Sequence, residues 1–397
     1  MQRLLGILTA IFIVLGVLAA AQYYVWARLV RDVGWSDSTR RWLTLLVIGL
    51  GVSIPASFIL SRQLPPKHGI GFLYVVYTWM GSLLLLLLAL GLTDLARVIL
   101  EQVVPGPSHF AAEPERRLFL KRALATLATF VTGASTAVAI KEATSNVVVR
   151  NVHVTLKRLP ASMHGFTIAQ ISDIHLGPTL REDFINRIVD QVNALDADIV
   201  AITGDLVDGT VDHLRDIVAP IQRLRGRHGV FFVTGNHEYY SGVTEWIAEL
   251  GRLGIRVLRN ERVSIGTPEA SFDLVGVDDA HAHSFGFGHG EDVPRAVSGR
   301  DPNREAVLLA HQPRTVFAAA ENGIGLQLSG HTHGGQIWPF NYVVRLQQPV
   351  IKGLAKIGSV WLYVNSGTGY WGPPMRLGAP PEITRVVLQA EQASRLV

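Results

Sequence analysis

The sequence has 397 residues and no cysteine. Disulfide bonds, thiolate metal ligands and a cysteine nucleophile are therefore excluded, and the redox state of the compartment stays open. Charged residues are scarce, at 17% of the chain, whereas hydrophobic residues make up 48%. This balance is apolar for a soluble protein, and the apolar excess lies before residue 141. The length suffices for a membrane region followed by one globular domain of about 250 residues.

The sequence also lacks a basic stripe with interleaved aromatic residues. Its formal net charge is only +4, and the visible clusters of Lys and Arg flank apolar segments. This distribution is typical of membrane topology signals and argues against a nucleic-acid partner. We therefore expect a membrane-embedded protein that does not bind nucleic acid.

The first 145 residues instead contain a series of long apolar segments. Three of them, near 4–26, 42–60 and 71–92, carry no charged residue and are long enough to cross a bilayer as helices. A fourth segment, 123–140, is richer in Ala, Thr and Gly, and its apolar content is marginal. It is either a fourth span or an amphipathic or buried helix. The second alternative would leave the following domain in the cytoplasm.

The short loops between these segments carry unequal numbers of basic residues. If the N-terminus lies outside, the inner loops hold nine of them and the outer loops three. The positive-inside rule favours this orientation in the cytoplasmic membrane, and a fourth span would then carry residues 146–397 to the extracytoplasmic face. The inner residues are Arg28, Arg31, Arg40, Arg41, Arg97, Arg116, Arg117, Lys121 and Arg122, and the outer ones are Arg3, Arg62 and Lys67.

Residues 116–121 read RRLFLK and stand directly before the fourth segment. Paired arginines, a spacer, Phe-Leu-Lys and a mildly apolar helix resemble the twin-arginine export signal. The position departs from that signal, which is normally N-terminal, and Glu115 stands where Ser or Thr is usual. Small residues at Ala137 and Ala139 match a signal-peptidase cleavage pattern. The simpler alternative is that the arginines anchor the helix at the cytoplasmic face.

The second part of the chain, residues 146–397, has the pattern of an α/β domain. Apolar runs alternate with amphipathic helices, and continuous apolar strands indicate a largely parallel sheet buried on both faces. Later strands are less clearly separated by helices, so we expect layered mixed β-sheets with flanking helices. The expected strands are 166–172, 197–204, 229–235, 271–277, 306–310, 326–329, 361–364 and 383–388, and the expected helices are 183–195, 211–224 and 244–253.

Five of the expected strands end in carboxylate, amide or imidazole residues. Such side chains at the carboxyl ends of strands in an α/β sheet point into one crevice. Each motif alone is explained by a turn, a helix cap or a solvated loop, but five at strand ends favour a metal site. The donors are oxygen and imidazole groups without sulfur, which suits Mn²⁺, Fe or Zn²⁺. The residues are Asp173, His175, Asp205, Asp208, Asn236, His237, Glu238, His311, His331 and His333.

The five motifs are Asp-x-His, Gly-Asp-x-x-Asp, Gly-Asn-His-Glu, a lone His and Gly-His-x-His, between about residues 166 and 335. In this order they resemble the calcineurin-like metallophosphoesterase superfamily. The run NSGTGYWGPPMRLGAPPEIT (365–384) resembles its bacterial branch with N-terminal transmembrane segments. The resemblance implies a hydrolase of phosphate mono- or diesters that uses two divalent metal ions.

The resemblance also implies a role for each site residue. Asp205 would bridge two metal ions, and His237, oriented by Asp208, would serve as a general acid or phosphate contact. Glu238 would only position its loop. Arg376 would contact a substrate phosphate or form a surface salt bridge. The first metal ion would be held by Asp173, His175, Asp205 and His333, and the second by Asp205, Asn236, His311 and His331.

A membrane anchor makes a lipid or cell-envelope phosphate ester a candidate substrate. One alternative is a lipid-linked pyrophosphatase similar to a UDP-2,3-diacylglucosamine hydrolase. Nucleotide-linked lipids of that kind are made in the cytoplasm, however, which disagrees with the expected orientation. Another alternative is a metal-binding scaffold without turnover. A scaffold would need the metal ligands but not the general acid His237.

Overall fold

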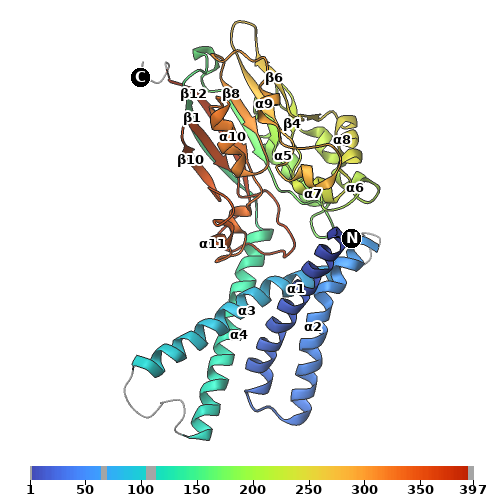
Figure 1. Cartoon of the computed structure of the whole chain (residues 1–397), viewed down its shortest axis with the longest axis vertical. Helices are drawn as coiled ribbons and strands as arrows, with labels where there is room; N and C mark the ends of the chain where they lie inside the picture. Colours follow the sequence, from blue (N-terminus) through green and yellow to red (C-terminus); the bar gives the residue numbers. More distant parts are fainter. Residues whose placement is uncertain (1, 64–68, 104–112, 392–397) are drawn as a thin grey trace. The chain divides into compact units, whose positions relative to one another are not determined.

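The computed structural model describes residues 2–63, 69–103 and 113–391 (Figure 1). These residues form two compact units, the first reaching to Ile140 and the second beginning at Lys141. Lys67, which counts among the outer basic residues, and the side chains of Arg3 and Arg62 lie outside the described residues. So do the last six residues of the expected C-terminal domain, 392–397.

Four long apolar helices make up the first unit, as the sequence predicts. They are α1 (Gln2–Trp26), α2 (Asp37–Gln63), α3 (Ile70–Val103) and α4 (Pro114–Thr144), and a π-helical turn, η1 (Ala27–Arg31), extends α1. Each helix contains a stretch long and apolar enough to cross a membrane. The marginal segment 123–140 lies within α4, which is the least apolar of the four but still qualifies.

The first unit exposes apolar side chains to a degree that is unusual for a soluble protein. Phe12, Trp42 and Phe130, on three different helices, are 78%, 72% and 73% exposed. A small buried cluster that includes Val25 and Leu86 holds the four helices together. Broad apolar outer surfaces on helices of this length are expected where side chains face lipid. The four helices are therefore candidate membrane-spanning segments.

The second unit contains two six-stranded mixed sheets. The first sheet has the order β1 (Val148–Leu156), β12 (Glu382–Ala390), β2 (Thr167–Ile171), β3 (Ile199–Ile202), β4 (Val230–Phe232) and β5 (Arg256–Val257). The second has the order β10 (Gly353–Ile357), β11 (Val360–Val364), β9 (Leu326–Ser329), β8 (Ala306–Leu309), β7 (Ser271–Gly276) and β6 (Glu261–Gly266). Strands β2 to β5 run parallel, as do β7, β8, β9 and β11, and antiparallel pairs join β12 to β2, β6 to β7 and β10 to β11.

Helices cover the outer faces of both sheets, so the second unit has four layers (Figure 1). The helices are α5 (Glu182–Asn193), α6 (Val211–Val218) and α8 (Val243–Arg252) on the first sheet, and α9 (Val293–Ala296) and α10 (Val316–Glu321) on the second. Successive strand residues point to opposite faces. In β3, Ile199 and Ala201 join the core between the sheets, while Val200 and Ile202 pack under the helices. The expected layered α/β fold is confirmed.

The structure corrects the sequence-based elements in two respects. The helix expected over 211–224 ends at Val218 and continues as a 3₁₀ turn, η3 (Ala219–Arg223), because Pro220 lacks the N–H that an α-helix requires. All eight expected strands are present, but β1, β5, β6 and β10 were not anticipated. β1 pairs with β12 from the far end of the chain, Val148 lying opposite Glu382.

Candidate metal centre

The polar residues that follow five strands meet at one end of the two sheets. β2, β3 and β4 of the first sheet and β8 and β9 of the second end in the loops that carry them. Because parallel strands have their carboxyl ends at the same edge, each sheet delivers its polar loops to a shared crevice. Of the expected site residues, the first sheet supplies all the carboxylates and the second sheet supplies only imidazoles.

One group of ligand atoms comes from Asp173, His175 and His333, and these atoms lie within 4.8 Å of one another. His333 Nε2 is 3.0 Å from His175 Nε2 and 3.4 Å from Asp173 Oδ1. All three side chains are buried. His175 Nδ1 lies 3.0 Å from Asp208 Oδ1. Donation from Nδ1 to this carboxylate leaves the lone pair of Nε2 facing into the group.

A second group comes from Asp205, His311 and His331, also within 4.8 Å. His311 Nε2 is 3.1 Å from Asp205 Oδ2 and 3.2 Å from His331 Nδ1. His311 Nδ1 donates to the carbonyl of Thr203 at 2.7 Å, which turns Nε2 toward the site. Asp205 Oδ2 is also 3.9 Å from His175 Nε2. Asp205 therefore stands between the two groups.

Asn236 contributes an amide oxygen that has no partner in the described part of the chain. It is the first residue of α7 (Asn236–Tyr240), only 7% exposed, and its Oδ1 is buried without a hydrogen bond. The next backbone N–H, that of His237, donates to Asp205 Oδ1 at 2.8 Å, so the start of α7 is held against Asp205. An orphaned buried oxygen is costly unless a ligand satisfies it.

The backbone of the site adopts conformations that non-glycine residues rarely take. Asp173, His175, Asp205, His331 and His333 all have positive φ, between 49° and 70°. Each such residue costs on the order of 1–3 kcal/mol and persists only where the surrounding structure imposes it. The strain turns side chains from separate loops toward one point, which is typical of a ligand site rather than of ordinary turns.

Two glycines of the motifs are required by close packing against the carboxylates. A Cβ on Gly235 would lie 2.2 Å from Asp205 Oδ1. A Cβ on Gly330 would lie 2.1 Å from Asp173 Oδ2 and 1.9 Å from the hydroxyl of Ser172. These contacts are far shorter than any real Cβ tolerates, so the glycines let the loops of both sheets approach the ligands.

The electrostatics keep several donors in their metal-binding forms. Burial, reinforced by the neighbouring His311, lowers the pKa of His331 to about 3. Burial also lowers the pKa of His333 well below its usual range. Burial opposes ionisation of Asp205, yet His311 outweighs it and holds the pKa of this carboxyl well below its usual range. Neutral imidazoles and an ionised carboxylate are the forms that bind metal ions, so His331, His333 and Asp205 are ready to bind. Burial opposes protonation of His311, but Asp205 outweighs it and raises the pKa of His311 well above its usual range, so His311 has to release its proton when it binds a metal ion.

His237 and Asp208 form a pair beside these groups. His237 Nδ1 lies 2.5 Å from Asp208 Oδ1. Burial opposes protonation of His237, but the carboxylates of Asp205 and Asp208 outweigh it and raise its pKa to about 9. Burial would raise the pKa of Asp208, but His175 and His237 lower it well below its usual range. The neighbouring carboxylates therefore favour the protonated imidazole of His237, and ionised Asp208 orients it.

Glu238 holds three loop amides in place. Its carboxylate accepts hydrogen bonds from the backbone N–H groups of Gly235 at 2.7 Å, Leu206 at 2.8 Å and Asp205 at 3.0 Å. It is 1% exposed, and burial together with nearby Asp205 raises its pKa to about 8, while the amide donors act in the opposite direction. Glu238 thus ties the loop after β3 to the start of α7 and positions both.

Arg376 neither reaches the surface nor faces a substrate site, so both expectations for it were wrong. Its side chain is fully buried, and its guanidinium donates to the carbonyls of Ser366 at 2.9 Å, Ala379 at 2.7 Å and Gly369. It also lies 3.3 Å from His333 Nδ1. Arg376 therefore organises the loop after β11 and buttresses one site histidine from behind.

Two aromatic residues beside His237 were missed in the sequence analysis. The rings of Tyr240 and Trp371 lie edge-on to its imidazole, with centroids 5.2 Å and 5.7 Å away. Both side chains are more than half exposed, at 60% and 52%. The only available signal for Trp371 was its place in the Gly- and Pro-rich run 365–384. By contrast, the four histidines expected at the surface are exposed: His153, His164, His213 and His228.

The donor set fits a pair of divalent cations. Two groups of largely buried Asp and His atoms lie close together, since Asp205 of one group is 3.9 Å from His175 of the other. The orphaned Asn236 Oδ1 needs a partner, and acceptors outside the groups orient His175 and His311. Oxygen and imidazole ligands held by outer hydrogen bonds are the usual surroundings of such ions. The site is therefore consistent with a dinuclear metal centre.

Sequence comparison with known proteins agrees with the assignment of the five motifs. The family model of calcineurin-like phosphoesterases matches residues 166–335. An uncharacterized metallophosphoesterase from Helicobacter pylori is 41% identical over 218 residues, which cover 54% of this chain and 58% of the relative. The solved structure of a dimetal phosphatase from Danio rerio has a TM-score of 0.36 at 15% identity, covering 57% of this chain and 93% of that one.

A transmembrane protein with a metallophosphoesterase domain from Bos taurus is similar over nearly the whole chain. The two sequences are 36% identical over 387 residues, which cover 92% of this chain and 86% of the relative. The similarity thus extends through the apolar N-terminal helices as well as the five motifs. Because this identity spans most of both chains and the family model matches the region of the five motifs, the chain belongs to the calcineurin-like metallophosphoesterases.

Proposed function

We propose that this protein is a membrane-anchored phosphoesterase that hydrolyses phosphate mono- or diesters with two divalent metal ions. The orphaned Oδ1 of Asn236, held beside Asp205 among converging donors, is the observation that carries the proposal. Mn²⁺, Fe or Zn²⁺ would suit these donors. One ion would be held by Asp173, His175, Asp205 and His333, and the other by Asp205, Asn236, His311 and His331.

When bound, the two ions would polarise the phosphate oxygens and activate a water molecule at neutral pH. His237 would protonate the leaving-group oxygen, since its pKa near 9 keeps it in the acid form. Asp208 would hold the imidazole through Nδ1, which leaves Nε2 to reach the substrate. Glu238 would keep Asp205 and α7 in register through its three backbone hydrogen bonds.

The test uses the purified full chain, stripped of metal with a chelator and then supplied with Mn²⁺, Fe²⁺ or Zn²⁺. We expect two ions per chain by elemental analysis and metal-dependent release of p-nitrophenol from mono- or bis-p-nitrophenyl phosphate. Two bound ions without hydrolysis of any ester would support the alternative of a metal-binding scaffold. Hydrolysis that survives the chelator would contradict the metal requirement.

A pocket beside His331 supports a substrate with both a phosphate and an apolar part. The pocket has a volume of about 670 Å³, and Arg314, Arg345, Phe317 and Leu346 line it together with His331. Guanidinium groups suit phosphate oxygens, and exposed apolar side chains suit an apolar substituent. Phe317 and Leu346 are 57% and 86% exposed. We therefore favour a lipid or lipid-like cell-envelope phosphate ester as the substrate.

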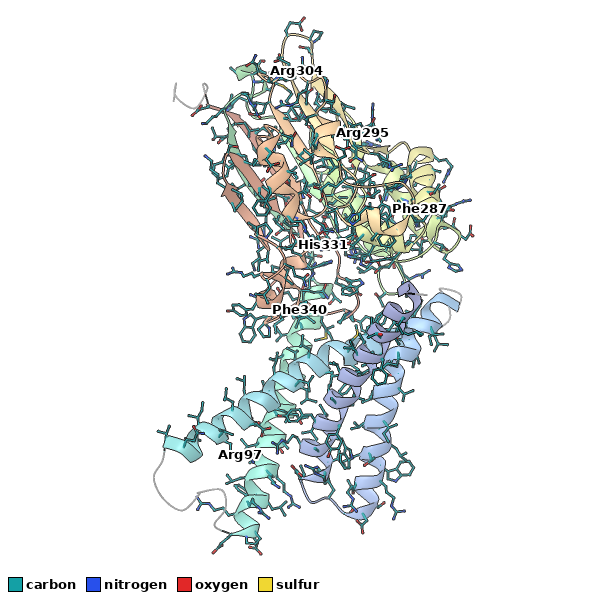
Figure 2. All side chains as sticks on the ribbon, in the orientation of Figure 1. Arg97, Phe287, Arg295, Arg304, His331 and Phe340 are labelled. Carbon is teal, nitrogen blue, oxygen red and sulfur yellow. The ribbon has the colours of Figure 1, made fainter. Side chains whose placement is uncertain are left out.

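Further apolar side chains surround the part of the chain that carries Leu346. Around the short helix α11 (Asn341–Val344), Trp338, Phe340, Tyr342 and Val343 are between 46% and 59% exposed (Phe340 is labelled in Figure 2). So many exposed large apolar residues within one short segment are unusual on a soluble surface. They would contact the acyl chains or the bilayer surface from which such a substrate comes.

The double variant Phe317→Ser with Leu346→Ser tests this substrate class. We expect KM for a dioctanoyl phosphatidic acid to rise about tenfold, while hydrolysis of p-nitrophenyl phosphate is unchanged, because only the lipid uses the apolar wall. Leu354→Ser, which removes a partly exposed leucine on β10, is the control. Equal effects on both substrates would refute the lipid assignment without affecting the proposed hydrolysis.

We also propose that the second unit lies on the extracytoplasmic face, on the strength of the nine-to-three distribution of basic loop residues. The motif RRLFLK would then act as a twin-arginine signal that moves a folded, metal-loaded unit, because its ligands come together only after folding. The simpler anchoring role also has support, since Arg122 donates to the carbonyls of Val33 at 2.9 Å and Gly34 at 3.1 Å.

Protease accessibility of a C-terminal tag in spheroplasts separates the two roles of the arginines. Arg116→Lys with Arg117→Lys keeps the positive charge but removes the paired guanidinium groups. A twin-arginine signal predicts that the tag becomes protected, with the first three spans undisturbed. A tag that stays as accessible as in the parent protein would mean that the arginines only anchor α4.

A further inference from the structure

Six charged residues of the first unit line a pocket between three of its helical segments. The pocket has a volume of about 220 Å³ and is lined by residues from η1 and its C-terminal end, α3 and α4. Four basic side chains and two carboxylates contribute, which leaves a surplus of two positive charges. The charged lining residues are Arg28, Asp32, Asp94, Arg97, Arg117 and Lys121 (Arg97 is labelled in Figure 2).

Both carboxylates are already neutralised by their own neighbours. Asp94 accepts hydrogen bonds from Arg28 Nη2 and from the hydroxyl of Tyr24, each at 2.6 Å. Asp32 accepts from Arg31 Nε at 2.9 Å and from Arg28 Nη1 at 3.3 Å. These pairs use up the negative charge of the two carboxylates that line the pocket. An additional anion is therefore the natural partner for the remaining cations.

Two of the remaining cations form no close ion pair, although Lys121 also lies within electrostatic range of Asp32. Across residues 2–63, 69–103 and 113–391, neither Arg117 nor Lys121 forms an ion pair within 4.0 Å. They stand one turn apart near the start of α4, so both can reach the same group. Uncompensated charges gathered in a pocket repel one another, and a phosphate group would accept several N–H donors from them.

The rest of the lining is mostly apolar, and two of the basic residues lie at the ends of candidate spans. Leu90, Leu120 and Leu124 share the pocket with the basic residues. Arg28 lies in the last turn of the first candidate span, while Arg117 stands in the first turn of the fourth. Basic groups at the ends of spans, next to leucines, match the headgroup and acyl chains of one lipid better than a free ion in water.

We propose that this pocket binds the phosphate headgroup of an anionic phospholipid, with the leucines contacting its acyl chains. Such a lipid would tie α4 to α3 and to η1 by neutralising Arg117 and Lys121. The expected orientation places the pocket on the cytoplasmic side, where anionic lipids attract basic residues near the membrane. This site is separate from the proposed metal centre and does not depend on it, because all its residues belong to the first unit.

Native mass spectrometry of the full chain in detergent provides the test. We expect one molecule of phosphatidylglycerol to bind more tightly than phosphatidylcholine. Arg117→Gln with Lys121→Gln should weaken this binding by about tenfold to thirtyfold, since each basic residue near the headgroup contributes a few-fold. The matched control, Arg41→Gln with Arg116→Gln, removes two exposed basic residues outside the pocket and also breaks the arginine pair. It should leave binding unchanged.

Three results would overturn the proposal. Equal retention of the two lipids would mean that the basic residues serve topology alone. Equal loss in the control would mean that charge in general, rather than this pocket, attracts the lipid. Displacement of the lipid by millimolar inorganic phosphate would make the pocket a site for a free anion. If the double variant fails to fold, Lys121→Gln alone should still weaken binding about fivefold.

Discussion

The two units of the protein both contain clustered ionisable groups, but they hold them in opposite ways. In the first unit, Arg28 and Asp94 project from helical segments with ordinary backbone angles, and Asp94 is satisfied by Arg28 and by Tyr24. In the second unit, Asp205 and four other site residues have positive φ, and the Oδ1 of Asn236 has no partner among the described residues.

The difference separates charges that stabilise a fold from charges that serve a ligand. The half-buried carboxylate of Asp94, which accepts hydrogen bonds from a guanidinium and a hydroxyl at 2.6 Å, is complete without any further group. In the second unit, the Asp and His ligand atoms are held by strained backbone, and the Oδ1 of Asn236 still has no hydrogen-bond partner among the described residues. Such a site is incomplete until a ligand binds. The same reasoning directs attention in the first unit to Arg117 and Lys121, which form no close ion pair with a carboxylate of the described residues.

Asp205→Asn should have the largest effect on hydrolysis, because Asp205 lies at the centre of the second unit's group of ligand residues. Asp205 Oδ2 is 3.1 Å from His311 and 3.9 Å from His175, so its charge serves both groups. We expect kcat/KM for an aryl phosphate ester to fall roughly a thousandfold or more. Elemental analysis should show fewer than two metal ions per chain.

Asp190→Asn is the matched control for this loss of charge. Asp190 is an exposed carboxylate of α5 that pairs with Arg223 at 3.2 Å, so its replacement should change neither rate nor metal content. Full metal occupancy in the Asp205→Asn protein would contradict the assignment of Asp205 as a shared ligand.

His237→Ala should have the next largest effect, because it removes a proton donor and no proposed ligand. We expect two metal ions to remain and the rate for an alkyl ester to fall about 10²–10⁴-fold. The loss should be smaller for a p-nitrophenyl ester, whose leaving group needs little protonation. Equal losses for the two leaving groups would exclude the general-acid role.

The pH dependence gives a second measurement of the same proton. The raised pKa of about 9 means that His237 carries its proton below that value and loses it as the pH rises through it. Bound cations repel a proton, so the alkaline fall of the parent's rate should lie at or below this pH. The His237→Ala protein should lack this fall, and an unchanged alkaline limb would assign it to another group.

Sequence alone could predict much of this fold because most of the evidence was local. Helix length and apolarity identified the four membrane segments, and apolar runs identified eight of the twelve strands. The site residues were also accessible, because each motif directly follows its own strand. β1 was missed since its partner β12 comes from the other end of the chain, and only the folded sheet shows that Val148 faces Glu382.

Features that depend on several distant segments could not be predicted. Arg376 was placed at the surface or at a substrate because its sequence context is a polar loop, yet that loop folds around its guanidinium. The basic pocket of the first unit also needs three helical segments to meet. In both cases the partners of a charge are set by tertiary packing, which short motifs do not encode.

Arg376→Gln should have an intermediate effect that extends the comparison, since this buried cation, like Arg28 of the first unit, already has its partners. Its loss leaves buried carbonyls without donors, at about 1–3 kcal/mol each. We expect the free energy of unfolding of the second unit to fall by about 3 kcal/mol or more, and hydrolysis to fall about tenfold as His333 loses its support. Denaturant titration of the full chain followed by tryptophan fluorescence measures the first quantity.

Arg225→Gln, at an exposed arginine, is the control and should be neutral. A stable Arg376→Gln protein with normal activity would show that the loop after β11 is organised by other contacts.

Asp94→Asn should have the smallest effect on hydrolysis and completes the comparison with Asp205→Asn. Asparagine can still accept the hydroxyl of Tyr24, and Arg28 keeps Asp32 at 3.3 Å, so the first unit should lose only about 1–3 kcal/mol of stability. The rate of ester hydrolysis should stay within about twofold of the parent, because no proposed ligand or proton donor is touched. Replacing Asp by Asn would thus abolish ester hydrolysis when the change is made at Asp205 in the second unit, and leave it nearly unchanged when it is made at Asp94 in the first. If Asp94→Asn instead abolished hydrolysis while both metal ions stayed bound, the charges of the first unit would have to act on the active site, and the two clusters could no longer be treated as independent.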